Sequence, residues 1–409
     1  MTQPMSDGSG SQNAWLRGMS PAFRLMLATS WLAPESWQKR QEQDIRLAHA
    51  AGPDWDEYLR LVDRHRTPAL SWAALKRVPG LEIPENVSKV LKEGSDACRL
   101  TALRHIRLLS EVLKAFNEND IPVMPLKGPF LSLDLYGDLG LRQSKDIDLE
   151  IALEDIPRAQ TCLYNLGYVL EPEYFPMTPR QKERFQLIEH HLGFTHFRDG
   201  CHLELCWRDT TELPEQTSAR WNRKVPAIWQ RSSYWQMDAI GRVLFLCCHA
   251  GGHAWFRAKW LGDVARIRAN EEIDWEAALD EARKMHQERI LLAAMHLLQQ
   301  AYGLPLPALP EKAWKNLPMF LVNEPLRALA NEREHEEQRA LPRLRNGFRS
   351  FLYLKRLLPL RTWRQTLLRL TYYREDFREF PLPDSFFWAY APLRPVFWIW
   401  RRLRPRRIH

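Results

Sequence analysis

An alternating run at residues 146–151, Asp-Ile-Asp-Leu-Glu-Ile, constrains the fold more than any other part of this chain. Such alternation predicts a β-strand, in which side chains two residues apart point to the same face. Asp146 and Asp148 then lie side by side, while Ile147 and Leu149 face a core. Neighbouring carboxylates repel each other unless a cation holds them, and hard divalent ions take oxygen ligands. The run is a candidate site for Mg²⁺ or Mn²⁺; the alternative is an ordinary Asp-x-Asp pair at a turn or a solvated strand edge.

A second candidate region lies upstream of this run. Residues 121–125 form a short apolar stretch that predicts a strand, and residues 129–136 have the apolar spacing of a helix. Between them stand Lys127 and Gly128. At a strand–glycine–helix junction, backbone N–H groups and the helix dipole favour phosphate. Lys127 adds a positive charge at the junction, and Arg142 adds another shortly before the acidic run.

Four short motifs in this part of the chain resemble a known family: Leu126-Lys127-Gly128, Tyr136-Gly137, Arg142 and Asp146-Ile147-Asp148-Leu149. They are similar to the bacterial uncharacterised nucleotidyltransferase group of the DNA polymerase β-like nucleotidyltransferase superfamily. That superfamily carries a Gly-Ser or Gly-Gly turn, then Asp-x-Asp or Asp-x-Glu on a strand, then a third carboxylate on a later strand. Here Lys127-Gly128 stands where the Gly-Ser pair usually stands, as it does in this particular group.

The resemblance implies a third carboxylate, and Glu204 is the best candidate. Residues 201–207 alternate so that His202, Glu204 and Cys206 share one face of a predicted strand. Similar sequences have Asp-Leu-His-Trp at this point, so Glu204 takes the place of the Asp and Cys206 takes that of the His. The alternative is that Glu204 is a solvated strand residue.

A second block of resemblance lies further along the chain, at His249, His253, residues 260–263, residues 274–275 and residues 304–305. His249 and His253 have a spacing that zinc enzymes use on a helix, but the glutamate of His-Glu-x-x-His is absent, which favours structural histidines. Within the resemblance, His253, Lys259 and Asp263 are further candidates to face the nucleotide or the acceptor.

Local patterns predict the elements around these motifs. Between the acidic strands we expect a helix over residues 154–166 ended by Gly167, a strand over residues 168–170 and a hairpin that turns at residues 198–200. The resulting core is a small mixed β-sheet with helices on one side. The fold class is therefore α+β, a nucleotidyltransferase core with large helical N- and C-terminal flanks.

Both flanks have the apolar spacing of helices. Residues 21–119 are helical throughout and end in a long helix over residues 85–117. After the core, Asp238 predicts an N-cap for a helix over residues 240–250. Further helices are expected over residues 258–269, 275–285 and 290–302, the last one ended by Gly303.

The length of 409 residues suggests two or three domains at about 150 residues each. Composition and patterning divide the chain into a disordered lead (1–12), a helical N-terminal region (13–100), the nucleotidyltransferase core (101–215), a helical domain (216–338) and a basic aromatic tail (339–409). The six cysteines show no paired metal-ligand spacing, and no charged start precedes an apolar segment. A cytoplasmic location is expected, with association at the membrane surface as an alternative.

The tail differs from the rest of the chain in charge. Residues 339–409 contain 17 Lys and Arg against 4 Asp and Glu, a net charge of +13; because the whole chain carries +8, the preceding residues carry −5. Two aromatic clusters, at residues 386–390 and 397–400, are interleaved with arginines. Such a segment can bind nucleic acid by stacking and phosphate contacts, or an anionic membrane surface. The structural alternative is that its helices cover the acidic body of the protein.

The resemblance implies transfer of a nucleoside monophosphate from an NTP to an unidentified acceptor, with release of pyrophosphate. Asp146, Asp148 and Glu204 would then bind Mg²⁺ (or Mn²⁺), and Lys127, Gly128 and Arg142 would hold the phosphates. Two other functions are compatible with the sequence. One is a non-catalytic binding or scaffolding protein that associates with a membrane or nucleic acid through its tail. The other is a toxin-like enzyme that modifies tRNA or protein.

Overall fold

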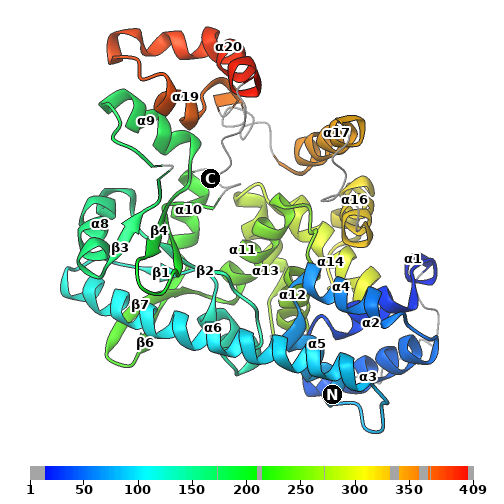
Figure 1. The fold of residues 1–409 in the computed structure, drawn as a ribbon. Helices are drawn as coiled ribbons and strands as arrows, with labels where there is room; N and C mark the ends of the chain where they lie inside the picture. Colours follow the sequence, from blue (N-terminus) through cyan, green and yellow to red (C-terminus); the bar gives the residue numbers. More distant parts are fainter. Residues whose placement is uncertain are drawn as a thin grey trace. The chain divides into compact units, whose positions relative to one another are not determined.

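The structure, a computed structural model, describes residues 14–172, 174–209, 214–270, 272–331, 340–358, 367–368 and 370–403. Contacts divide the chain into two compact units, whose elements are labelled in Figure 1. The first unit contains the described residues of Met1–Arg107, Lys127–Lys145 and Met237–Leu357; the second contains those of Leu108–Leu126, Asp146–Gln236 and Leu358–His409. The lead expected at residues 1–12 and parts of the tail, including residues 404–409, lie outside the described residues.

The second unit is built on a five-stranded mixed sheet with the order β1-β2-β5-β4-β3. The strands are β1 (Met124–Pro125), β2 (Asp146–Glu150), β3 (Tyr168–Leu170), β4 (His191–His196) and β5 (His202–Cys206). β2 and β5 pair in parallel, whereas the β1–β2, β4–β5 and β3–β4 pairs are antiparallel. This confirms the small mixed sheet and the α+β class.

One face of this sheet is the core that the alternation predicts. Leu149, Leu203, Leu205 and Phe194 are completely buried on it. Helix α8 (Ile156–Asn165) follows a short 3-10 helix, η1 (Leu153–Asp155), and buries Ile156, Ala159, Cys162 and Leu163. Tyr164 of α8 also makes an edge contact with the Phe194 ring, so α8 packs on the apolar face of β4. The opposite face is left for polar side chains.

Three elements of the second unit lie outside the expected pattern: the hairpin of β6 (Lys224–Trp229) and β7 (Ser232–Met237), helix α9 (Pro179–Ile188) and helix α10 (Pro214–Trp221). The backbone N–H of Trp235 donates to the carbonyl of Val123 at 2.9 Å, which ties the hairpin to the chain just before β1. A capping box begins α9, because Thr178 and Gln181 each bond the backbone of the other.

The first unit is helical. Its N-terminal helices are α1 (Ala14–Arg17), α2 (Pro21–Thr29), α3 (Glu35–Ala50), α4 (Trp55–His65) and α5 (Pro68–Lys76). Helix α7 (Pro129–Tyr136) also belongs to it, together with α11 (Ala239–Gly252), α12 (Ala258–Asn270), α13 (Trp275–Lys284), α14 (Glu288–Tyr302), α15 (Glu311–Lys315), α16 (Phe320–Ala330) and α17 (Ala340–Leu357).

The predicted ends of these helices are confirmed. Asp238 caps α11 by accepting from the Gly241 N–H at 2.7 Å, and Gly303 ends α14 in the left-handed conformation with φ 68°. The long helix expected before the core is α6 (Glu85–Glu118); its residues up to Arg107 belong to the first unit and those from Leu108 to the second.

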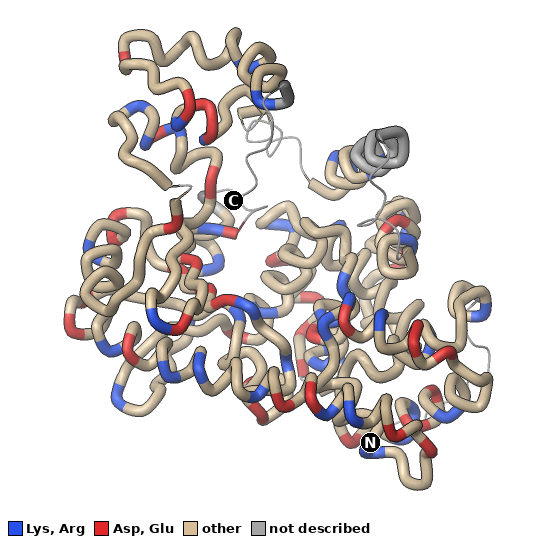
Figure 2. The backbone as a smooth tube through the Cα atoms, viewed as in Figure 1, with Lys and Arg blue, Asp and Glu red and all other residues tan. Residues whose placement is uncertain are grey.

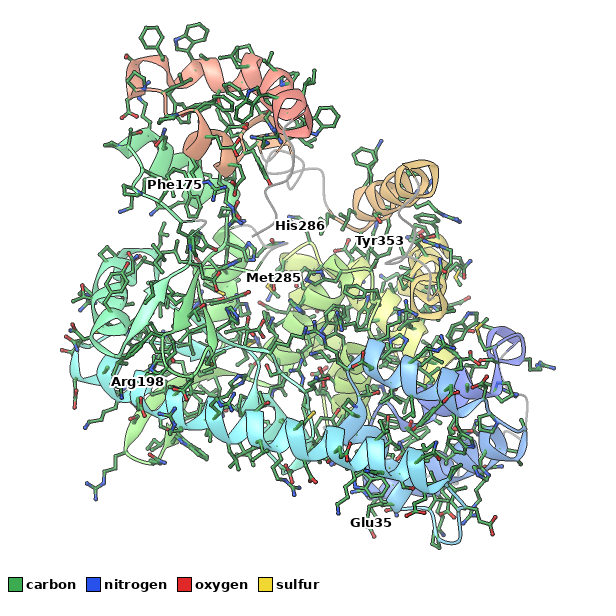
Figure 3. All side chains as sticks on the ribbon, viewed as in Figure 1. Glu35, Phe175, Arg198, Met285, His286 and Tyr353 are labelled. Carbon is green, nitrogen blue, oxygen red and sulfur yellow. The ribbon has the colours of Figure 1, made fainter. Side chains whose placement is uncertain are left out.

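The described C-terminal elements of the second unit are α19 (Arg374–Glu379), the 3-10 helix η3 (Asp384–Ala389) and α20 (Tyr390–Leu403). Phe377, Phe387, Tyr390 and Phe397 form a buried cluster with Ile188 of α9. Phe175, labelled in Figure 3, packs against this C-terminal cluster. This part of the tail therefore packs on the second unit, as the structural alternative predicts. Among the described residues, no helix is long and apolar enough to cross a membrane.

Candidate active site

The polar face of the sheet brings Asp148 and Glu204 together. The parallel pairing of β2 and β5 places Asp148 opposite Glu204, Asp146 opposite His202 and Glu150 opposite Cys206. All six residues therefore share one face of two adjacent strands. The period-two patterns of both strands favour this register over a shift by one residue, which would turn the buried leucines toward the polar side.

The tightest group on this face consists of Asp148, Glu204 and Cys206. One ligand atom from each lies within 4.8 Å of the other two, which is close enough for a single metal ion. Asp148 and Cys206 are buried, and Glu204 is half-buried. Among the described residues, this is the one group of three or more such side chains that meets this distance, and Asp146 is not part of it. Asp146 lies on the same face but at the start of β2, where it is half-buried.

The donor atoms of this group fit a hard divalent ion. Two carboxylates from neighbouring strands supply the oxygen ligands that Mg²⁺ and Mn²⁺ prefer. The thiol of Cys206 is a softer ligand, and its Sγ lies 3.8 Å from the Glu204 carbonyl oxygen. Asp148 and Glu204 are thus the residues of this group that would hold such an ion, and a part of Asp146 in binding it stays a prediction.

Glu150 is the third acidic residue of β2, but an arginine neutralises it. Its carboxylate is completely buried, and the Arg220 guanidinium donates to it at 2.6 Å. Trp221 also donates its indole N–H to Glu150. Both partners come from the end of α10. Because this pair compensates the buried charge, Glu150 adds no uncompensated negative charge beside Asp148.

A further carboxylate, Glu171, lies on the same polar face; it is not among the site residues predicted from the sequence. Its Oε1 is 2.8 Å from Nδ1 of His202, and the Thr195 hydroxyl donates to it at 3.3 Å. Gly193 of β4, which pairs with Glu204, provides the space: a Cβ at this glycine would stand 2.4 Å from a Glu171 carboxylate oxygen. The local signal was the continuing alternation, because Glu171 follows Val169 by two residues at the end of β3.

The junction around Lys127 has the geometry expected of a glycine turn. Gly128 caps α7 with φ 80° and ψ −149°, a conformation that is essentially restricted to glycine. Pro129 then begins the helix. The residue before Lys127, Leu126, donates its N–H to the carbonyl of Asp148 at 3.0 Å. Lys127 itself is half-buried. Its contact with a phosphate, like that of Gly128, stays a prediction.

Arg142 is held inside the first unit. Its side chain is 2% exposed, and Nε donates to the completely buried Asp263 carboxylate at 2.8 Å. The Arg142 backbone N–H donates to the Ser132 hydroxyl, and the buried Lys259 ammonium donates to the Gln143 carbonyl. Both contacts fix the loop that leads to β2. A role of Arg142 at the phosphates stays a prediction; the contact in the structure is with Asp263.

The charges around Arg142 perturb one another. Burial raises the pKa of the Asp263 carboxyl, and Arg142 opposes this shift. Burial lowers the pKa of Lys259 well below its usual value, and the charge of Arg142 acts in the same direction. The Asp263 carboxylate opposes this lowering, so it favours the charged forms of both Arg142 and Lys259.

His249 and His253 lie in an aromatic cluster at the end of α11. The His253 ring stacks on Trp260 with centroids 5.2 Å apart, and the His249 ring makes an edge contact with the same indole at 5.5 Å. The two imidazole rings are 5.0 Å apart at a steep angle. These contacts support the structural interpretation of the two histidines.

Comparison with known proteins agrees with this geometry. The family model described as "Uncharacterised nucleotidyltransferase" matches residues 51–303, which is more than half of the chain. The protein therefore belongs to this uncharacterised nucleotidyltransferase family, and nucleotidyltransferase activity is supported at that general level. The comparisons with curated proteins and with solved structures found no match.

Proposed function

We propose that the protein is a metal-dependent nucleotidyltransferase that moves a nucleoside monophosphate from an NTP to a hydroxyl-bearing acceptor. The observation that carries this proposal is the pairing of Asp148 with Glu204 on adjacent parallel strands, within a chain of this family. In a protein without catalytic activity, clustered carboxylates are unfavourable because their negative charges repel each other. They are useful where a divalent ion and a polyphosphate must be held together.

In the proposed reaction, the acceptor oxygen attacks the α-phosphorus of the NTP. A new P–O bond forms, the bond from the α-phosphorus to the bridging oxygen breaks, and pyrophosphate leaves. Asp146, Asp148 and Glu204 would hold the ion, and Glu204 would also orient the hydroxyl and help to take up its proton. Mg²⁺ or Mn²⁺, when bound, supplies positive charge that compensates the phosphate oxygens. Lys127, Gly128 and Arg142 are assigned to the phosphates, so that most of the rate gain comes from positioning and charge.

The test is incubation of the purified protein with each NTP labelled at its α-phosphate, in the presence of Mg²⁺ or Mn²⁺ and cell extract. Label should move to an acceptor while pyrophosphate is released. Asp148→Asn and Glu204→Gln should lower this transfer by about a hundredfold or more, the scale on which single groups that stabilise transition-state charge act. Glu154→Gln is the matched control, because Glu154 is exposed and lies beyond the polar face.

A binding or scaffolding role predicts a different result. NTP with Mn²⁺ would then raise the melting temperature by mass action without any transfer of label. If that shift were also equal in wild type and in Asp148→Asn, both the metal assignment and the proposed reaction would be wrong.

A further inference from the structure

Helix α20 is fixed to the second unit by one of its faces. Tyr390 and Phe397 on this face are buried in the cluster with Phe377. The Tyr390 hydroxyl accepts from the Gln181 side-chain amide of α9 at 3.0 Å. Arg394 and Arg401 both form ion pairs with the buried carboxylate of Asp376. These contacts hold the helix against the protein along its length, so its remaining surface is presented in a defined orientation.

The rest of that surface is apolar and exposed. Val396 and Ile399, which are three residues apart on the helix, are 57% and 51% exposed, and Leu393 continues the stripe. In η3, immediately before the helix, Trp388 is 65% exposed and Phe386 is also exposed. Single exposed apolar residues are normal, but a row of aliphatic residues beside exposed aromatic rings indicates an interaction surface. We call Phe386, Trp388, Leu393, Val396 and Ile399 the apolar stripe.

The chain segment that carries most of the apolar stripe is basic in sequence. Residues 385–409 contain six arginines and no aspartate or glutamate. Arg394 and Arg401 contribute to the ion pairs with Asp376 described above, and Arg402, Arg404, Arg406 and Arg407 follow directly in the sequence. Figure 2 shows basic residues toward the C-terminal end of α20. A partner that is apolar where it meets the stripe and anionic toward the C-terminal end of α20 fits this surface.

We propose that the apolar stripe docks on the surface of an anionic lipid bilayer, with α20 lying in the plane of the interface. Aliphatic side chains, tryptophan and arginine together are the composition of interfacial helices, in which apolar groups enter the acyl boundary and cations meet the headgroups. Single-stranded nucleic acid is the less suitable partner, because bases stack on aromatic rings and gain little from Val396 or Ile399. This inference adds a location to the proposed reaction and does not depend on it.

The test uses the full-length protein and vesicles of phosphatidylcholine that contain about one third phosphatidylglycerol, with pure phosphatidylcholine vesicles for comparison. The protein should cosediment with the anionic vesicles but not with the pure phosphatidylcholine vesicles. It should be released as the salt concentration rises, because salt screens the attraction between the arginines and the anionic headgroups. Val396→Asp with Ile399→Asp should weaken this binding by about tenfold or more, since both side chains would lose their transfer into the interface. Ile228→Asp is the matched control: Ile228 is 75% exposed in the same unit and lies far from the stripe in sequence, on β6.

Thermal melting tests whether each variant folds. If the double variant is unstable, Trp388→Ser, which changes an exposed residue of η3, replaces it and should also weaken vesicle binding. Four results would overturn the proposal. They are no binding of wild type to the anionic vesicles, equal binding by the double variant, equal loss in Ile228→Asp, or a dimer in solution that the double variant dissociates. Binding of single-stranded RNA that depends on the arginines and leaves vesicles unbound would also assign the surface to nucleic acid instead.

Discussion

Acidic residues on one strand have different surroundings, and therefore different chemical roles. Asp148 and Glu150 point to the same face of β2, two residues apart. Asp148 meets Glu204 and Cys206, whereas Glu150 meets the guanidinium of Arg220. The first arrangement attracts a cation, and the second is already compensated. The same distinction applies to Arg142, whose charge is paired with Asp263.

Replacement of Asp263 by Asn should destabilise the first unit by about 3–5 kcal/mol, because it leaves the buried charge of Arg142 uncompensated. Urea unfolding measures the change. Glu311→Gln, which removes an exposed partner of Lys315, is the control and should have little effect. Similar unfolding midpoints for the two variants would show that the buried pair contributes no more than a surface pair.

His65 should make the stability of the first unit depend on pH. It is completely buried, and its Nδ1 accepts the Ala258 N–H at 3.0 Å. Burial lowers its pKa well below 6.5, so the folded state keeps the ring neutral while the unfolded state protonates it. The unfolded state binds more protons below pH 6.5, and stability is therefore lost as the pH falls from there, by up to about 1.4 kcal/mol per pH unit.

The measurement is urea unfolding of wild type and His65→Asn between about pH 5 and pH 7, the range in which an ordinary histidine titrates. Asn keeps a hydrogen-bond acceptor but does not titrate. The free energy of unfolding of the variant should fall less steeply toward acid. Parallel curves for the two proteins would remove His65 as the source of the slope.

At the scale of elements, close approach of helices positions the buried charges around Arg142. Helix α12 carries Lys259, Gly262 and Asp263. At Gly262 the helix lies so close to the end of α2 that a Cβ would stand 2.7 Å from the Ser30 carbonyl oxygen. This contact is with backbone, which cannot rotate away as a long side chain can. The glycine therefore sets how closely α12 approaches its neighbour.

Gly262→Ala should destabilise the first unit by about 1–3 kcal/mol through overpacking, partly offset by about 1 kcal/mol of improved helix propensity. Thermal and urea unfolding test this. Gly18→Ala is the control, because a Cβ there would find its nearest neighbour at 3.6 Å, an ordinary contact. A Gly262→Ala protein as stable as wild type would mean that α2 and α12 can separate at no cost.

At the scale of the whole molecule, both compact units are assembled from stretches far apart in sequence. The second unit takes its sheet from residues 124–206 and packs it with the C-terminal elements through α9. Residues 372–397 of the basic tail thus have a structural role, in addition to any partner that the exposed stripe binds. Each unit combines three separate stretches of the chain, so the two units do not correspond to consecutive segments of the sequence.

Phe377→Ala should destabilise the second unit by about 3–5 kcal/mol, the usual cost of deleting a buried aromatic ring. Phe377 is 1% exposed within the C-terminal cluster, while Phe386, a residue of the same type in the same segment, is 56% exposed. Phe386→Ala is therefore the matched control and should leave the melting temperature nearly unchanged. Equal melting temperatures for both variants would contradict a structural role of this cluster.

The sequence by itself determined the elements and their faces. The structure confirms the predicted strands β2 and β5, the N-cap Asp238 and the terminating Gly303. Each of these features depends only on residues close to it in the sequence. Glu204 was proposed because the resemblance implies a third carboxylate, and the structure places it opposite Asp148. The elements α9, α10, β6 and β7 were not predicted, although the capping box of Thr178 and Gln181 is a local signal for the start of α9.

Only the tertiary structure decided which charges meet. Arg220 lies 70 residues from Glu150 in sequence, and Arg142 lies 121 residues from Asp263. No local pattern encodes such pairs, because they depend on strand register, helix packing and the burial that makes a lone charge unfavourable. The parallel register of β2 and β5, which brings Asp148 to Glu204, arises in the same way. The sequence indicated which side chains are candidates for the chemistry, and long-range packing determined which of them lie within reach of one another.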